Sequence, residues 1–240
     1  MKAPLPRLAV AMDAPSVEPL EPILDELAGL PILIKVGLSL FTAVGPSVVH
    51  HMRLAGFPVF LDLKLHDIPH QVALAVEAAA RLDVAMLTVH LAGGRAMLEA
   101  ALTAARGRTR IIGVTVLTSL GDAELAEVGC PLGASETVAR RLQLAHSVGL
   151  QGAVLSPREL QLAARLDPRF LRVVPGIRSH HEQLAAHDDQ QRTASAGQAV
   201  QDGASVLVVG RPIVASPDPR AAAEAILAEL GVAPSVGSQG

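Results

Sequence analysis

Three charged residues stand within six positions in FLDLKLHDIPH, the segment that covers residues 60–70 and begins with strand-forming residues. They are Asp62, Lys64 and Asp67. A strand that only fills a core has no use for them, because an isolated buried charge is very costly. Side chains two positions apart on a strand share a face, so Asp62 and Lys64 are expected to point the same way. An ammonium held among carboxylates stays charged and can stabilise or protonate a developing anion.

Polar residues follow most of the other apolar runs as well. Gly210 and Arg211 suit a phosphate, because the glycine exposes backbone N–H groups and the arginine supplies a forked donor. A structural ion-pair cluster is the alternative explanation, and it would suffice for a lone Asp–Lys pair. Polar groups follow nearly every predicted strand, and this favours a functional site. Besides those already named, these groups are Asp13, Lys35, His90, Thr118, Ser119 and the segment Pro175 to Arg178.

Eight apolar or β-branched runs alternate with helical patterns such as residues 71–81 and 136–147. The runs are continuous, as expected for parallel strands covered by helices. Eight such repeats in about 240 residues predict an α/β fold of the (β/α)₈ TIM-barrel type, in which the catalytic residues follow the strands. A doubly wound sheet is the rival, but the first run lacks its glycine fingerprint. The expected strands are 8–12, 32–36, 59–63, 86–90, 110–117, 152–155, 170–174 and 206–209.

The composition fits one domain, expected over residues 1–232, with a flexible tail over residues 233–240. The net charge is -3, and the chain has no Trp or Tyr, so neither a nucleic-acid partner nor base stacking is indicated. No apolar stretch is long enough to span a membrane. Cys130 is the single cysteine, which excludes an internal disulfide and favours a cytoplasmic location.

The histidines show no metal-ligand spacing, and no metal site is predicted. His66 and His70 flank the acidic motif and are expected to support it. His90 is equally consistent with a pocket-lining role and with a satisfied core position. Cys130 has no base in sequence reach and is expected to be inert.

An eight-residue signature and six further segments of this chain, in the family's order, resemble the orotidine 5′-phosphate decarboxylase family. Residues 62–69, DLKLHDIP, match its D-x-K-x-x-D-I-P signature. The others are AMD near the start, KVG after the second strand, GVTVLTS after the fifth, VVPGIR after the seventh with DDQQR beyond it, and VVGRPI at the eighth. The resemblance covers nearly the whole chain.

The resemblance implies a homodimeric (β/α)₈ barrel that converts orotidine 5′-monophosphate to UMP and CO₂ without metal or cofactor, in the last step of de novo pyrimidine synthesis. Lys64 is the implied proton donor to C6. Lys35 and Asp62 would join it in an alternating charge network, which Asp67 completes from the partner subunit.

The resemblance also implies the groups that bind the substrate. Asp13 and Lys35 would lie near the ribose hydroxyls and Thr118 near the pyrimidine, and Asp62 is a further implied substrate contact. Gln190 would bridge from phosphate to base. Arg178, Gly210 and Arg211 would hold the phosphate. The remaining implied substrate contacts are Ile68 within the signature, Gln71 just after it, and Pro175 after the seventh strand.

Two features depart from the family. His70 and Gln71 stand where the family usually has Asn-Thr, whose threonine helps bind ribose across the interface. The segment between Arg178 and Gln190 is also longer than in typical members.

Three other functions fit parts of this pattern less well. A Mg²⁺-dependent sugar-phosphate decarboxylase or epimerase of the same superfamily would place an acidic ligand near Lys35. A Schiff-base aldolase would need a lysine whose pKa is depressed, whereas flanking carboxylates raise it. A non-catalytic protein that binds a phosphoribosyl ligand would have no need of Asp62 and Lys64.

Overall fold

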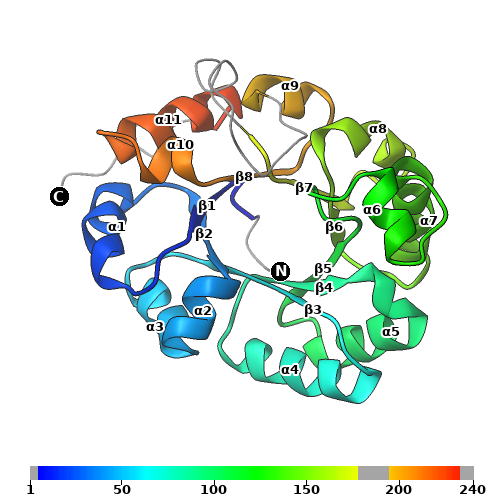
Figure 1. Ribbon diagram of the computed structural model, residues 1–240. Helices are drawn as coiled ribbons and strands as arrows, with labels where there is room; N and C mark the ends of the chain where they lie inside the picture. Colours follow the sequence, from blue (N-terminus) through cyan, green and yellow to red (C-terminus); the bar gives the residue numbers. More distant parts are fainter. Residues whose placement is uncertain (1–4, 178–194, 233–240) are drawn as a thin grey trace.

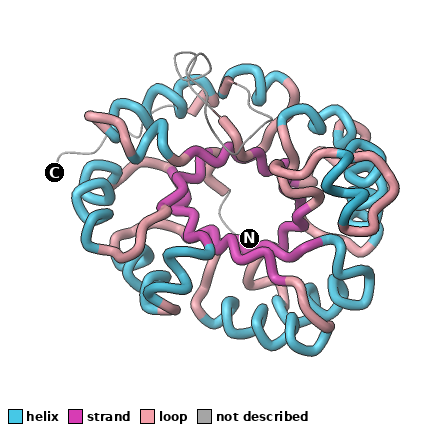
Figure 2. Tube along the Cα trace, viewed as in Figure 1, coloured by secondary structure: helices cyan, strands magenta, loops and turns pink. Residues whose placement is uncertain are grey.

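The computed structural model describes residues 5–177 and 195–232 of the chain. Its strands are all parallel and close into a barrel in chain order, with the eighth paired to the first (Figures 1 and 2). The (β/α)₈ prediction is confirmed. The strands are β1 (Leu8–Met12), β2 (Ile32–Gly37), β3 (Val59–Leu65), β4 (Met86–His90), β5 (Arg110–Val114), β6 (Gly152–Val154), β7 (Leu171–Val174) and β8 (Val206–Val209).

Helices surround the barrel as an outer ring (Figure 1). In α4, Pro69 takes the first position, where its missing N–H costs nothing, and Val72, Val76 and Ala79 form the buried face at helical spacing. The described helices are α1 (Glu21–Leu27), α2 (Leu38–Val44), α3 (Ser47–Leu54), α4 (Pro69–Arg81), α5 (Gly94–Ala105), α6 (Asp122–Glu127), α7 (Ala134–Ser147), α8 (Leu160–Ala163), α9 (Ala196–Gln201), α10 (Arg211–Val214) and α11 (Pro219–Glu229), with short 3₁₀ turns η1 (Glu18–Leu20), η2 (Leu91–Gly93) and η3 (Pro157–Glu159).

The expected strand bounds agree with the structure to within two residues except in the fifth strand, which ends at Val114 instead of residue 117. Its neighbour β6 is only three residues long, and the last pair in the register is Val114 with Val154. Beyond that point Thr115 turns its hydroxyl to the Val154 carbonyl at 2.8 Å, and Arg141 donates to the Thr115 carbonyl. Side chains therefore replace the ladder where the partner strand stops.

Two apolar layers hold the barrel together. Alternate strand residues point outward and pack under the helices, while a separate cluster fills the interior. The interior cluster consists of Ala9, Ala11, Leu33, Phe60, Met86, Ile112, Val173, Val206 and Val208. Strand parity then places the residues two positions after Leu33, Phe60 and Met86 on the same inner face, nearer the carboxyl ends of the strands. Those residues are polar: they are Lys35, Asp62 and Thr88.

None of the helices in residues 5–177 and 195–232 is long and apolar enough to cross a membrane. The tail over residues 233–240, expected to be flexible, lies outside the described residues.

Candidate active site

Lys35 and Asp62 come from neighbouring strands at the carboxyl end of the barrel. The β2–β3 register pairs Lys35 with Phe60 and Gly37 with Asp62, so the two charged side chains are diagonal neighbours on the inner face. Lys35 Nζ lies 3.8 Å from Asp62 Oδ2. Their side chains are nearly buried, at 10% and 13% exposure. Because charges this buried need compensation, further partners are required on both sides.

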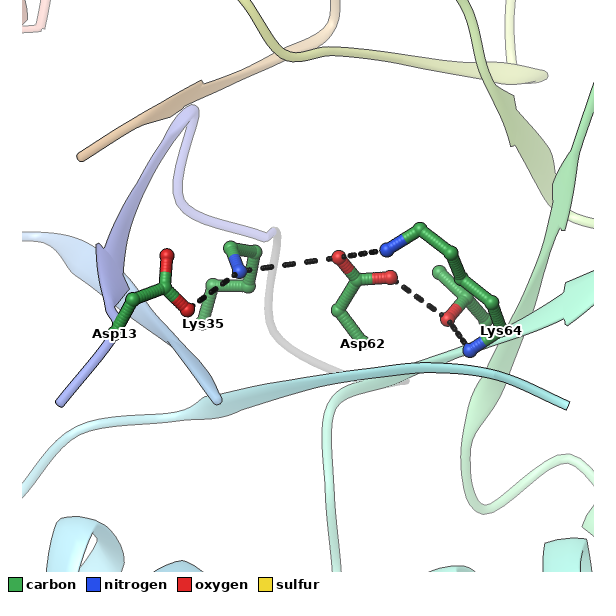
Figure 3. A network of polar contacts seen from close by, with 5 residues as sticks. Asp13, Lys35, Asp62 and Lys64 are labelled. Carbon is green, nitrogen blue, oxygen red and sulfur yellow. Dashed lines mark hydrogen bonds and ion pairs between the residues drawn. The ribbon is translucent and has the colours of Figure 1, made fainter. Parts of the chain in front are cut away.

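Asp13 and Lys64 supply that compensation. Asp13, just after β1, places Oδ1 3.6 Å from Lys35 Nζ, and Lys64 Nζ lies 2.8 Å from Asp62 Oδ2. Figure 3 shows the resulting row of alternating charges, Asp13, Lys35, Asp62 and Lys64. The two ends of the row are the more exposed, with 59% of the Asp13 side chain and 32% of Lys64 open to solvent. The row therefore runs from a buried centre to two ends that a ligand can reach.

The expected pairing of Asp62 with Lys64 is present, but a regular strand does not produce it. Lys64 has a φ of 49°, in the left-handed region that long side chains rarely adopt. The β3–β4 register also shifts between Leu61 and Leu65. The contact expected from the two-residue spacing is therefore present, but the backbone at Lys64 is not that of a regular strand.

Gly37 lies beside the charge row, and its lack of a side chain leaves room for the charged groups. A β-carbon built at this position would lie 2.9 Å from Asp13 Oδ1 and 3.1 Å from Lys35 Nζ. The backbone of Gly37 is extended, with φ at -92°, so conformation alone does not demand glycine. The glycine of the KVG segment is required because the charged groups occupy the volume beside it.

Asp67, Ile68 and Gln71 do not join the charge row of their own chain. The Asp67 carboxylate accepts a hydrogen bond at 2.6 Å from the N–H of Ile68, and within the described residues it forms no ion pair with Lys35 or Lys64. Ile68 is 62% exposed, and Gln71 is exposed on the first turn of α4.

The other predicted site residues within the described ranges follow the strands as expected. Thr118 lies in the turn after β5, Pro175 directly follows β7, and Gly210 and Arg211 connect β8 to α10. In a closed parallel barrel these positions share the end that carries the charge row. Arg178 and Gln190, together with most of the segment between them, lie outside the described residues.

His90, at the end of β4, stacks on His66, with ring centroids 5.2 Å apart and an angle of 19° between planes. Burial, followed by the nearby charges of Arg141, His66 and Lys64, lowers the pKa of His90 from 6.5 to about 4. Its Nδ1 accepts a hydrogen bond at 3.2 Å from the Ala92 N–H. His90 is thus a neutral packing group near pH 7, beside the charge row.

Thr88 was not identified from the sequence, although it belongs to the site. It is fully buried in β4, and its hydroxyl contacts both Asp62 and the backbone of Lys64. The available signal was a hydroxyl residue inside an otherwise apolar strand, on the same face as Met86.

The charge row does not present a set of metal ligands. Among the described residues, no group of three or more His, Cys, Asp and Glu side chains could hold a metal ion. The two carboxylates that approach each other here, Asp13 and Asp62, have the Lys35 ammonium between them. An ammonium in that position repels a second cation.

Comparison with known proteins gives consistent results. The model of the orotidine 5′-phosphate decarboxylase / HUMPS family matches residues 6–226. Orotidine 5′-phosphate decarboxylase of Halorhodospira halophila is 49% identical over 95% of this chain and 97% of the relative, and that of Opitutus terrae is 46% identical over 93% and 97%. The crystal structure of orotidine 5′-phosphate decarboxylase from Lactobacillus acidophilus superposes with a TM-score of 0.82 at 34% identity, covering 94% of this chain and 99% of that one. The chain therefore belongs to the orotidine 5′-phosphate decarboxylase / HUMPS family.

Proposed function

We propose that this chain converts orotidine 5′-monophosphate to UMP and CO₂, the last step of de novo pyrimidine synthesis. Family membership over nearly the whole chain supports the activity, since the relatives compared above carry that name. The single observation that carries the mechanism is the contact of Lys64 Nζ with Asp62 at 2.8 Å, in a row of alternating charges at the carboxyl end of the barrel.

The reaction breaks the bond between C6 of the pyrimidine and its carboxylate. CO₂ leaves, and the electron pair stays on C6 in an in-plane orbital that the ring π system cannot accept. An ammonium fixed beside C6 stabilises this charge, by roughly 4 kcal/mol for unit charges about 4 Å apart at an effective dielectric near 20. Lys64 then transfers a proton from Nζ to C6, which gives UMP, and regains a proton from solvent.

Asp62 and Lys35 keep this ammonium charged and aimed. Asp62 Oδ2 is shared by both lysines, at 2.8 Å from Lys64 and 3.8 Å from Lys35. Because these groups are held by the barrel before substrate arrives, little reorganisation is needed as charge develops. The site thus supplies electrostatic stabilisation and a proton from its own residues.

The remaining polar residues are assigned to substrate binding. Asp13 is the exposed end of the row and is suited to ribose hydroxyls, with Lys35 beside it. We assign Thr118, in the turn after β5, to the pyrimidine. Phosphate binding far from the bond that breaks can position the base and so raise the rate. The residues assigned to the phosphate are Gly210 and Arg211, with Arg178 and Gln190 outside the described residues, and Pro175 is assigned to substrate binding after β7.

We further propose a homodimer in which Asp67 reaches the site of the partner. Asp67 forms no ion pair with the lysines of its own row among the described residues. Ile68, next to Asp67 in the chain, and Leu74 on α4 expose 62% and 48% of their surfaces, which is apolar area that a second copy would cover. Asp67 of one chain would then complete the charge row of the other, with Ile68 and Gln71 at the junction.

A cytoplasmic location and a reaction without a cofactor complete the proposal. The single cysteine favours a reducing compartment. The Lys35 ammonium disfavours the divalent cation that the sugar-phosphate enzymes of this superfamily use.

The decisive experiment follows the loss of orotidine 5′-monophosphate absorbance with wild type, wild type in EDTA and Lys64→Ala. The expected result is a rate that EDTA leaves unchanged and that collapses in the variant. Loss of activity in EDTA would support the metal-dependent alternative. A folded wild type that binds UMP without turning over the substrate would instead indicate a binding protein.

A further inference from the structure

Strands β3 and β4 lose their regular register at the charge row. Phe60 pairs with Met86 and Leu61 with Leu87, but the next pair is Leu65 with Val89. Three residues of β3, numbers 62 to 64, therefore face only Thr88 on β4. Such a bulge leaves backbone groups without ladder partners and redirects the side chains beside it.

The hydroxyl of Thr88 occupies this gap. It accepts a hydrogen bond from the Lys64 N–H at 2.8 Å and donates one to Asp62 Oδ1 at 2.9 Å. The directions are determined by chemistry, because an amide nitrogen only donates and a carboxylate only accepts. Thr88 is completely buried, so bulk solvent does not compete for either bond.

These two bonds act on the two residues proposed for the chemistry. The bond to Asp62 occupies Oδ1 and so leaves Oδ2 for Lys64 and Lys35. The bond to the Lys64 N–H holds a residue whose φ of 49° is intrinsically unfavourable. A regular strand would give Lys64 an extended backbone and a different side-chain direction.

We propose that Thr88 is a positioning residue that pins the bulge in β3 and thereby aims the Lys64 ammonium and the Asp62 carboxylate at the reacting carbon. This inference rests on the proposed decarboxylation and extends it to a residue that does not contact the substrate. The hydroxyl of an ordinary buried threonine contributes only to stability, whereas that of Thr88 would also contribute to catalysis by fixing Asp62 and Lys64.

The test compares Thr88→Val, which keeps the shape and removes the hydroxyl, with Thr88→Ser, which keeps the hydroxyl. Because misplacing a catalytic group by about 1 Å costs on the order of 100-fold, kcat should fall by about 10- to 100-fold in Thr88→Val while KM changes little. Thr88→Ser should restore most of kcat. Should Thr88→Val not fold, Thr88→Cys replaces it, since a thiol of similar size is a weak hydrogen-bonding group, and the same loss is expected.

Thr109→Val is the matched control. Thr109 is also buried and its hydroxyl donates to the Val84 carbonyl at 3.0 Å, but it precedes β5 at the opposite end of the barrel. This variant should lose thermal stability and keep kcat. Equal kcat values in wild type, Thr88→Val and Thr109→Val would overturn the role of Thr88. A wild type without decarboxylase activity would refute the proposed function instead, so the two failures are distinguishable.

Discussion

The ammonium of Lys35 lies 3.8 Å from Oδ2 of Asp62, and both side chains are almost buried. On its other side the same ammonium lies 3.6 Å from Asp13. Among the described residues, Lys35 thus lies between two carboxylates of its own chain and compensates both. Removing a partner from a buried pair leaves an uncompensated charge, which costs more than the intact pair contributes.

Lys35→Met is therefore expected to lower the free energy of unfolding by about 3 kcal/mol, measured by urea denaturation at neutral pH. The control is Arg53→Met, which breaks an exposed ion pair with Asp83 at 2.6 Å and should cost at most about 1 kcal/mol. Combining Lys35→Met with Asp62→Asn should cost less than the sum of the two single changes, because the second removes a buried charge that the first deprives of one of its two ammonium partners. Equal costs for Lys35→Met and Arg53→Met would contradict this account.

Gly37→Ala should disturb the row without straining the backbone. Its added methyl group would lie 2.9 Å from Asp13 Oδ1 and 3.1 Å from Lys35 Nζ, closer than ordinary contacts. The side chains must shift, so decarboxylase activity should fall by about 10-fold or more. In Gly197→Ala, on α9, the new methyl group meets Glu229 at an ordinary 3.4 Å, and activity should stay at the wild-type level. Unchanged activity in both variants would contradict the claim that activity requires the Asp13 and Lys35 side chains in their present positions.

Much of this arrangement was predictable because its determinants are local. Apolar runs ending in polar residues located the strands and identified Asp13, Lys35, Asp62 and Lys64 as groups that meet. In a parallel barrel the carboxyl ends of strands converge, so sequence position relative to a strand end is already spatial information.

Other features depend on pairing between distant segments. The bulge opposite Thr88 arises from the register of β3 against β4, which no window of the sequence encodes. The end of β5 is set by the shortness of β6, some 40 residues further on. The requirement for glycine at position 37 depends on the positions of the Asp13 and Lys35 side chains, one of which comes from just after β1 and the other from β2.

The proposed sharing of Asp67 predicts complementation between inactive protomers. Lys64→Ala and Asp67→Ala chains should each be nearly inactive alone. A heterodimer would contain one site with both Lys64 and Asp67, so a randomly exchanged equimolar mixture should recover about one quarter of wild-type activity. Turnover is measured after protomer exchange, with heterodimers verified by two different affinity tags.

Mixing Lys64→Ala with Lys35→Ala provides the control for that experiment. Both residues belong to the same chain's row, at 2.8 Å and 3.8 Å from the same Asp62 oxygen, so neither site of this heterodimer is complete. No activity should return. Recovery in this control, or its absence with Asp67→Ala, would be evidence against a site shared across the interface.

His90 should make stability depend on pH below neutrality. Its pKa is about 4 in the folded protein because burial, then Arg141, His66 and Lys64, disfavour the charged ring, whereas an unfolded histidine has a pKa of 6.5. Between these values the unfolded chain binds more protons, so the contribution of His90 to stability is complete above pH 6.5 and declines as the pH falls toward 4. Partial exposure reduces the size of this loss, and we expect ~1–2 kcal/mol between pH 7 and pH 4.5.

His90→Gln removes the titrating ring, so its free energy of unfolding should fall less between pH 7 and pH 4.5 than that of wild type. Urea denaturation at several pH values measures this difference. His50→Gln, at an exposed position on α3, is the control and should keep the wild-type dependence. Parallel curves for wild type and His90→Gln would show that His90 is not held neutral. A steeper curve for His90→Gln would have the wrong sign, because the folded state would then bind the proton more tightly than the unfolded chain does.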